Sequence, residues 1–130
     1  MPEPLLTALL MADVIVSEDN GKKVLVGVFS RFNLQQFPAQ VAPWYLYAGV
    51  ENLKGRNSFT FNLAREDTQE VAFSAGGEIQ IQDPTSGVEV VFMVPPIIFR
   101  APGIYVLQFL VNGKSLISRN LPVSLVMASG

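Results

Sequence analysis

The sequence predicts an all-β fold, an antiparallel immunoglobulin-like β-sandwich of about seven to nine strands. Apolar and polar residues alternate along many short segments, and Gly, Pro, Asn and Asp occur between these segments. No convincing helical pattern follows residue 20. A chain of 130 residues can build one core, and it contains no repeat, low-complexity tract or linker. We therefore expect a single domain over residues 1–130.

The C-terminal part of the chain predicts a β-hairpin. Alternate residues from Tyr105 to Val111 are apolar, and Asn112 and Gly113 follow them. Both of these residues accept the positive φ that a type I′ turn requires. We expect the chain to return through residues 116–119, and Pro122 to end or offset that strand before residues 123–127.

Alternation also predicts a half-buried strand in "SFTFNLAR", where Phe59, Phe61 and Leu63 share one face. The turn signals "FPAQVAP", "LKGRN", "AGGE" and "DPTSG" separate further segments. These segments predict strands near residues 24–33, 44–53, 69–74, 78–82 and 88–93.

The N-terminal segment "EPLLTALLMADVIV" allows a helix or a strand. Pro4 and the leucines at helical spacing favour a helix. The β-branched run "VIV" and a turn at Asn20 and Gly21 favour a strand through residues 7–17, which we expect. Asp13 lies inside this apolar strand. Because a buried carboxylate is costly without partners, we expect Asp13 to accept hydrogen bonds from backbone amides or to pair with an arginine, and so to serve the fold.

The chain is poor in charge, and this predicts a protein partner. Charged residues make up 15% of the chain and hydrophobic residues 49%, whereas an average soluble domain has about 25% charged residues. The segments "VLVGVF" and "VVFMV" are apolar on both faces of a strand. We expect a non-catalytic interaction or structural module that self-associates, as a homodimer or other homo-oligomer, or binds a protein partner through an apolar sheet face.

Other partners are excluded on charge. The net charge is −2 and no basic cluster exceeds Lys22 and Lys23, so we expect neither nucleic acid nor a membrane as a partner. The apolar run "VVFMVPPIIF" is too short to cross a bilayer, and no signal peptide is recognised. The absence of cysteine fits a cytoplasmic location, which we expect.

The chemistry of the chain predicts no enzyme, no cofactor and no metal. Without histidine and cysteine, the common nucleophile systems and nearly all zinc sites are excluded. The acidic loop "SEDNG" precedes Lys22 and Lys23, which would repel a cation, so we interpret it as a turn. A carboxylate-dependent hydrolase is a third possibility, and its candidates are Asp13, Glu51, Glu66, Asp67, Asp83 and Glu89.

Aromatic residues suggest an alternative function. In "PWYLYAGVEN", Tyr45 and Tyr47 would share one face of a strand about 7 Å apart, a spacing that suits stacking on sugar rings. The alternative is a carbohydrate-binding module that uses Tyr45, Tyr47 and Trp44.

Both ends of the chain resemble a known family. The segments "ALLMADVIVSEDNGKKVLVGVFSRF" and "PPIIFRAPGIYVLQFLVNGKSLISRNLPV" resemble the start and the close of an uncharacterised bacterial family of small all-β domains. Its members tend to read "LLCDDVR", a Gly-Lys hairpin and "LIGVY", and later Pro-Gly-x-Tyr. This chain carries Met11 and Ala12 where the family often has Cys and Asp. The resemblance implies the immunoglobulin-like fold and no activity.

Overall fold

The computed structural model of the protein describes residues 3–83, 85 and 87–127, and every regular element in these ranges is a β-strand. The all-β class is therefore confirmed. The expected number of strands was too low, because three segments of three residues each also pair as strands. The strands are β1 (Leu5–Ser17), β2 (Lys23–Phe29), β3 (Phe32–Leu34), β4 (Ala39–Val41), β5 (Trp44–Glu51), β6 (Gly55–Arg65), β7 (Val71–Ile81), β8 (Val88–Val94), β9 (Ile97–Phe99), β10 (Gly103–Val111) and β11 (Lys114–Leu125).

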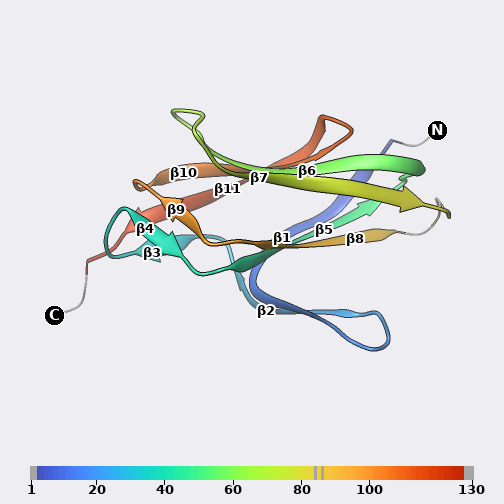
Figure 1. Ribbon diagram of the computed structural model, residues 1–130, viewed down its shortest axis with the longest axis horizontal. Helices are drawn as coiled ribbons and strands as arrows, with labels where there is room; N and C mark the ends of the chain where they lie inside the picture. The colour runs from blue at the N-terminus through green and yellow to red at the C-terminus, as the bar shows by residue number, and fades with distance from the viewer. Residues whose placement is uncertain (1–2, 84, 86, 128–130) are drawn as a thin grey trace.

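The strands form two larger sheets that lie as two layers (Figure 1). One layer has four strands in the order β2-β1-β5-β8, and the other has five in the order β3-β11-β10-β6-β7. The short strands β4 and β9 pair with each other. All pairs are antiparallel except β3 with β11. No helix in the described ranges is long and apolar enough to cross a membrane.

The core lies between the two layers, and strand alternation builds it. Along β10, every second side chain from Tyr105 to Val111 is buried, and the side chains between them are half-buried or exposed. Along β5, Trp44, Leu46 and Ala48 are buried in the same way from the other sheet. The largest fully buried side chains include Trp44, Phe61, Phe99, Phe109 and Met11.

The C-terminal hairpin forms as predicted, with one difference. Asn112 and Gly113 have φ values of 53° and 80°, as a type I′ turn requires. Pro122, however, does not end the strand, because β11 continues to Leu125. Pro122 pairs with Ile104 of β10, and the parallel partner β3 begins only opposite Val123. The missing N–H of the proline therefore lies where no neighbouring strand needs it.

The segment "AGGE" is not a turn. The strands expected at residues 69–74 and 78–82 are a single strand, β7, which pairs with β6 along its whole length. A Cβ atom at Gly76 would lie 3.0 Å from the carbonyl carbon of Phe59 and 3.1 Å from the Cα atom of Thr60. Gly76 is therefore required by the close approach of two strands rather than by a change of direction.

The N-terminal segment is a strand, as expected, and it joins two different partners. Residues 5–12 of β1 pair with β5, and residues 11–17 pair with β2. The strand expected at residues 24–33 is divided, since β2 ends at Phe29 and β3 begins at Phe32. Gly21 has a φ of 85° in the turn, and the Asn20 side chain accepts a hydrogen bond from the Lys22 amide at 3.0 Å.

Candidate functional site

The outward side of the four-stranded sheet is apolar. In the register of β1, β5 and β8, Leu10 lies beside Tyr47 and Tyr47 beside Val91, while Tyr45 lies beside Met93. Cross-strand neighbours point to the same side of a sheet, and here that side faces away from the core. Met93 is 53% exposed and Val91 36%. We call this surface the apolar face and define it as Leu10, Tyr45, Tyr47, Val91 and Met93.

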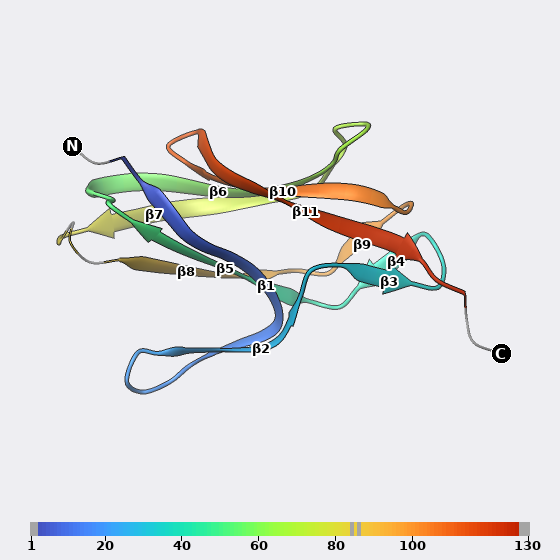
Figure 2. The ribbon, with the colours of Figure 1, turned by 180° about the vertical axis from the view of Figure 1, so that it is seen from behind.

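Beyond the sheet, β1 and β2 continue as a two-stranded ribbon, which we call the arm (residues 13–27). In both ribbon views the arm lies apart from the two layers, on the side of β5 and β8 that faces away from the five-stranded sheet (Figures 1 and 2). One side of the arm carries four valines that pair across it and are 41–51% exposed. The other side carries a half-buried pair of aliphatic side chains. The valines are Val14, Val16, Val24 and Val26, and the pair is Ile15 and Leu25.

Asp13 lies at the root of the arm, across from Gly27. The carboxylate is exposed, and within the described ranges it has no hydrogen bond or ion pair. The prediction of a buried Asp13 held by amides or an arginine is therefore wrong, because β1 leaves the core before this position. Gly27 has a φ of 69°, and a Cβ atom there would overlap the Asp13 carboxylate. The Asp13 side chain thus occupies the space that glycine leaves open.

The three aromatic candidates separate as strand alternation requires. Tyr45 and Tyr47 share one side of β5, as predicted, and they are half-buried on the side that faces away from the core. Trp44 points inward and is 2% exposed, with ring centroids 5.4 Å from Phe29 and 5.6 Å from Phe32. Trp44 is therefore a core residue that no ligand can reach, which corrects its place among the binding candidates.

Tyr47 is hydrogen-bonded to a carboxylate beside the apolar face. Its hydroxyl donates a hydrogen bond to Glu89 of β8. Burial, together with the hydrogen bond and the negative charge of Glu89, raises the pKa of Tyr47 to about 12. Tyr47 is therefore neutral at physiological pH. Its hydroxyl gives the Glu89 carboxylate a hydrogen-bond donor beside the apolar face.

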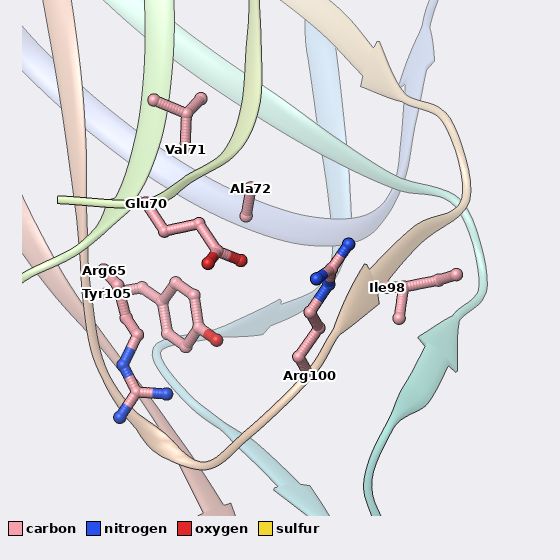
Figure 3. A pocket seen from close by; sticks show the side chains of 7 residues that line it. All are labelled: Arg65, Glu70, Val71, Ala72, Ile98, Arg100 and Tyr105. Carbon is pink, nitrogen blue, oxygen red and sulfur yellow. The ribbon is translucent and has the colours of Figure 1, made fainter. Parts of the chain in front are cut away.

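A pocket of about 210 Å³ lies at the opposite end of the core from the β10–β11 turn, between the β6–β7 turn and β9 (Figure 3). Arg65 donates from Nε to Asp67 Oδ1 at 2.7 Å and from a terminal nitrogen to Oδ2 at 3.2 Å. The hydrogen bond with Arg65 lowers the pKa of Asp67. The Tyr105 hydroxyl donates to the Ala101 carbonyl at 3.1 Å. The lining residues are Arg65, Glu70, Val71, Ala72, Ile98, Arg100 and Tyr105.

The sequence did not indicate this pocket, because its lining comes from two stretches, residues 65–72 and 98–105, that are far apart in the chain. Its arginines and its carboxylate offer charge but no nucleophile paired with a base. Among the hydrolase candidates, Glu66 and Asp67 lie in the β6–β7 turn, and Asp67 is engaged by Arg65. In the described part of the chain, no group of three or more acidic residues could hold a metal ion.

Comparisons with known proteins address fold and family. A solved structure of the Pseudomonas fluorescens alkylpurine DNA glycosylase AlkC, bound to DNA with an abasic site analog, is similar at a TM-score of 0.49 and 13% identity. The similarity covers 94% of this chain and 30% of that one, so this chain spans less than a third of the glycosylase. No curated protein matches the chain.

The prediction about partners is corrected by this comparison. The comparison shows no partner of this chain, and the similar structure contains DNA, so neither the expected homo-oligomer or protein partner nor the expected absence of nucleic acid is borne out. A likeness of this size carries no argument about what this chain binds.

Family membership has a firmer basis. The sequence model of a family of unknown function, DUF6941, matches residues 7–124. This range includes β2 to β10 entirely and nearly all of β1 and β11, and with them the arm and the apolar face. The chain therefore belongs to the family of unknown function DUF6941.

Proposed function

We propose that the protein is a non-catalytic interaction module that self-associates through the apolar face. One observation carries the proposal: three neighbouring strands present large apolar side chains outward, from Leu10 on β1 to Met93 on β8. A single sheet face of this kind is normally covered by another layer or is polar. The five-stranded sheet covers only the other side.

The size of the surface suits a stable dimer. Three strands about 4.8 Å apart and about 25 Å long present roughly 350 Å² in projection, and the two-stranded arm adds roughly 160 Å². The total is roughly 500 Å² in projection, and the accessible area of a surface of side chains is larger than its projection. This brings the surface towards the roughly 800 Å² per partner that a standard interface buries.

A second copy fits the chemistry of this surface. Glu89 lies at one end of this surface and accepts the hydrogen bond of Tyr47, and Glu51 is exposed further along β5. A face with so little charge offers no charge pattern by which a different protein would be selected. A two-fold pairing of the same face requires only matching apolar shape and brings few like charges together.

The test is the molar mass in solution, measured by light scattering on a sizing column at low micromolar concentration. We expect the wild-type chain to be a dimer. Met93→Lys places a charge on the buried face and should give monomers. Ile98→Lys is the matched control, because Ile98 is 57% exposed on β9, outside the apolar face, and this variant should remain a dimer. A monomeric wild-type chain, or equal behaviour of both variants, contradicts the proposal.

Carbohydrate binding is the second candidate, because Tyr45 and Tyr47 point outward together. Tyr45 lies beside Met93 and Tyr47 beside Val91, so few hydrogen-bonding groups surround the two rings. If this candidate is right, intrinsic fluorescence should respond to a glycan in a panel, and Tyr45→Ala should remove the response. A carboxylate-dependent hydrolase remains third. The immunoglobulin-like class of the sandwich, and a cytoplasmic location in a bacterium, are further parts of this proposal.

A further inference from the structure

We infer that the arm of one copy lies across the apolar face of a second copy, and that the second arm does the same in return. This inference rests on the proposed self-association and assigns the element that covers the face. The occupant of the face is thus a named segment, residues 13–27, of another molecule of this chain.

The first step is that the arm requires a partner. Within the described ranges, β2 is hydrogen-bonded to β1 alone, and the part of β1 beyond Ala12 is hydrogen-bonded to β2 alone. An isolated two-stranded ribbon is marginally stable in water. This ribbon also has apolar side chains on both sides, with Val14 paired with Val26 on one side and Ile15 with Leu25 on the other. A monomer leaves both sides of the arm without a covering layer.

The second step is that the arm does not cover the apolar face of its own chain. The views from the front and from behind both place the arm beneath β5 and β8 but apart from them (Figures 1 and 2). The exposed fractions agree, since Val26 is 51% exposed on the arm and Met93 is 53% exposed on the face. Two apolar surfaces on the same side of the molecule therefore remain open to a third surface.

The third step is that the arm fits the face in length and chemistry. The five residues of each arm strand, 13–17 and 23–27, span about 17 Å, which fits within the roughly 27 Å of the eight residues of β5. The valine side of the arm carries no charge. Asp13, at the root, lies on the side of the arm opposite the valines, and the other charged residues lie at or beside the tip, where Glu18 and Lys22 are exposed. The arm can thus lie on the face without burying a charge.

The fourth step is that a reciprocal arrangement satisfies all of these surfaces at once. In a two-fold dimer, each arm covers the apolar face of the other copy and lies beside the other copy's arm. One contact, made twice, therefore buries both apolar faces and both rows of valines. Gly27, with its φ of 69°, allows β2 to leave the direction of the sheet at the root of the arm. A different protein would have to supply a second apolar ribbon of the same length, which this chain already contains.

The experiment uses the natural absence of cysteine in the chain. Val24→Cys on the arm and Met93→Cys on the face are made as separate full-length chains with different tags, mixed, and treated with a short bis-maleimide. We expect a V24C–M93C product between the two tagged chains. Ser74→Cys, an exposed position on β7 of the other sheet, is the control and should not react with V24C.

The outcomes separate this inference from the proposed function. A dimer by light scattering that gives only M93C–M93C product, only V24C–V24C product, or none overturns the inference and leaves self-association standing. A monomer overturns both. Circular dichroism of each cysteine variant confirms that the substitution has not unfolded the chain, and both positions are exposed enough that we expect native spectra.

Discussion

Replacing Gly76 by alanine tests the packing of the outermost strand of the five-stranded sheet. A Cβ atom at this position would overlap the Phe59 carbonyl oxygen and lie 3.1 Å from the Thr60 Cα atom. These are backbone atoms of β6, and β6 is held on its other side by β10. Because β6 cannot move, β7 must shift away from it.

The magnitude follows from what that shift breaks. Moving β7 weakens about two ladder hydrogen bonds beside position 76, each worth about 0.5–1.5 kcal/mol net, and loosens the packing next to them. We expect Gly76→Ala to lower the free energy of unfolding by about 2–4 kcal/mol. For a domain of this size that corresponds to a fall in Tm of roughly 10 °C.

The neighbouring glycine supplies a matched control. A Cβ atom at Gly77 would lie 3.2 Å from the Phe59 ring, which is a side chain that can turn aside. Alanine in a strand also gains about 0.5–1 kcal/mol over glycine. Gly77→Ala should therefore stay within about 1 kcal/mol of wild type in urea unfolding monitored by Trp44 fluorescence. If both variants unfold at the same urea concentration, the close approach of β6 and β7 is not what requires glycine at position 76.

Two further predictions concern a buried amide and an alkaline pH range. Asn57 is 7% exposed, donates to the carbonyls of Lys54 and Gly55 at 3.1 and 3.3 Å, and accepts from the Asn112 side chain at 2.9 Å. Asn57→Ala should destabilise the protein by about 2 kcal/mol in urea unfolding, whereas Ser115→Ala in the exposed return strand should have no measurable effect. The folded-state pKa of Tyr47 is raised from 10.0 to about 12, so its contribution to stability is complete below pH 10 and is lost as the pH rises from 10 to 12. The free energy of unfolding of Tyr47→Phe should therefore fall less than that of wild type between pH 10 and 12. If the free energies of unfolding of the two proteins fall equally with pH, Tyr47 does not titrate as assigned.

The parts of the fold that depend on neighbouring residues were predictable. The type I′ turn at Asn112 and Gly113 requires only two residues that accept positive φ, and the structure has both. The shared side of Tyr45 and Tyr47 requires only the period of a strand. Trp44 was misassigned because alternation says which residues share a side but does not say which side is the core.

The remaining parts depended on contacts between distant segments. "AGGE" has the composition of a turn, and only the backbone of β6 against Gly76 shows that these glycines lie inside a strand. Asp13 has the sequence environment of a buried residue, and only the departure of the arm from the sheet leaves it exposed. The pocket around Arg65 and Arg100 could not be anticipated, because no short pattern links the segments that line it.

The sequence by itself determined that this protein is all-β, where most of its strands lie, and that it has more apolar surface than one small core can bury. These properties follow from a two-residue period, turn chemistry and composition, which are local or additive. Only the tertiary structure decided where the excess apolar surface lies. It lies on the outer side of β1, β5 and β8 and along the arm, because strand order determines which side of a sheet receives a second layer.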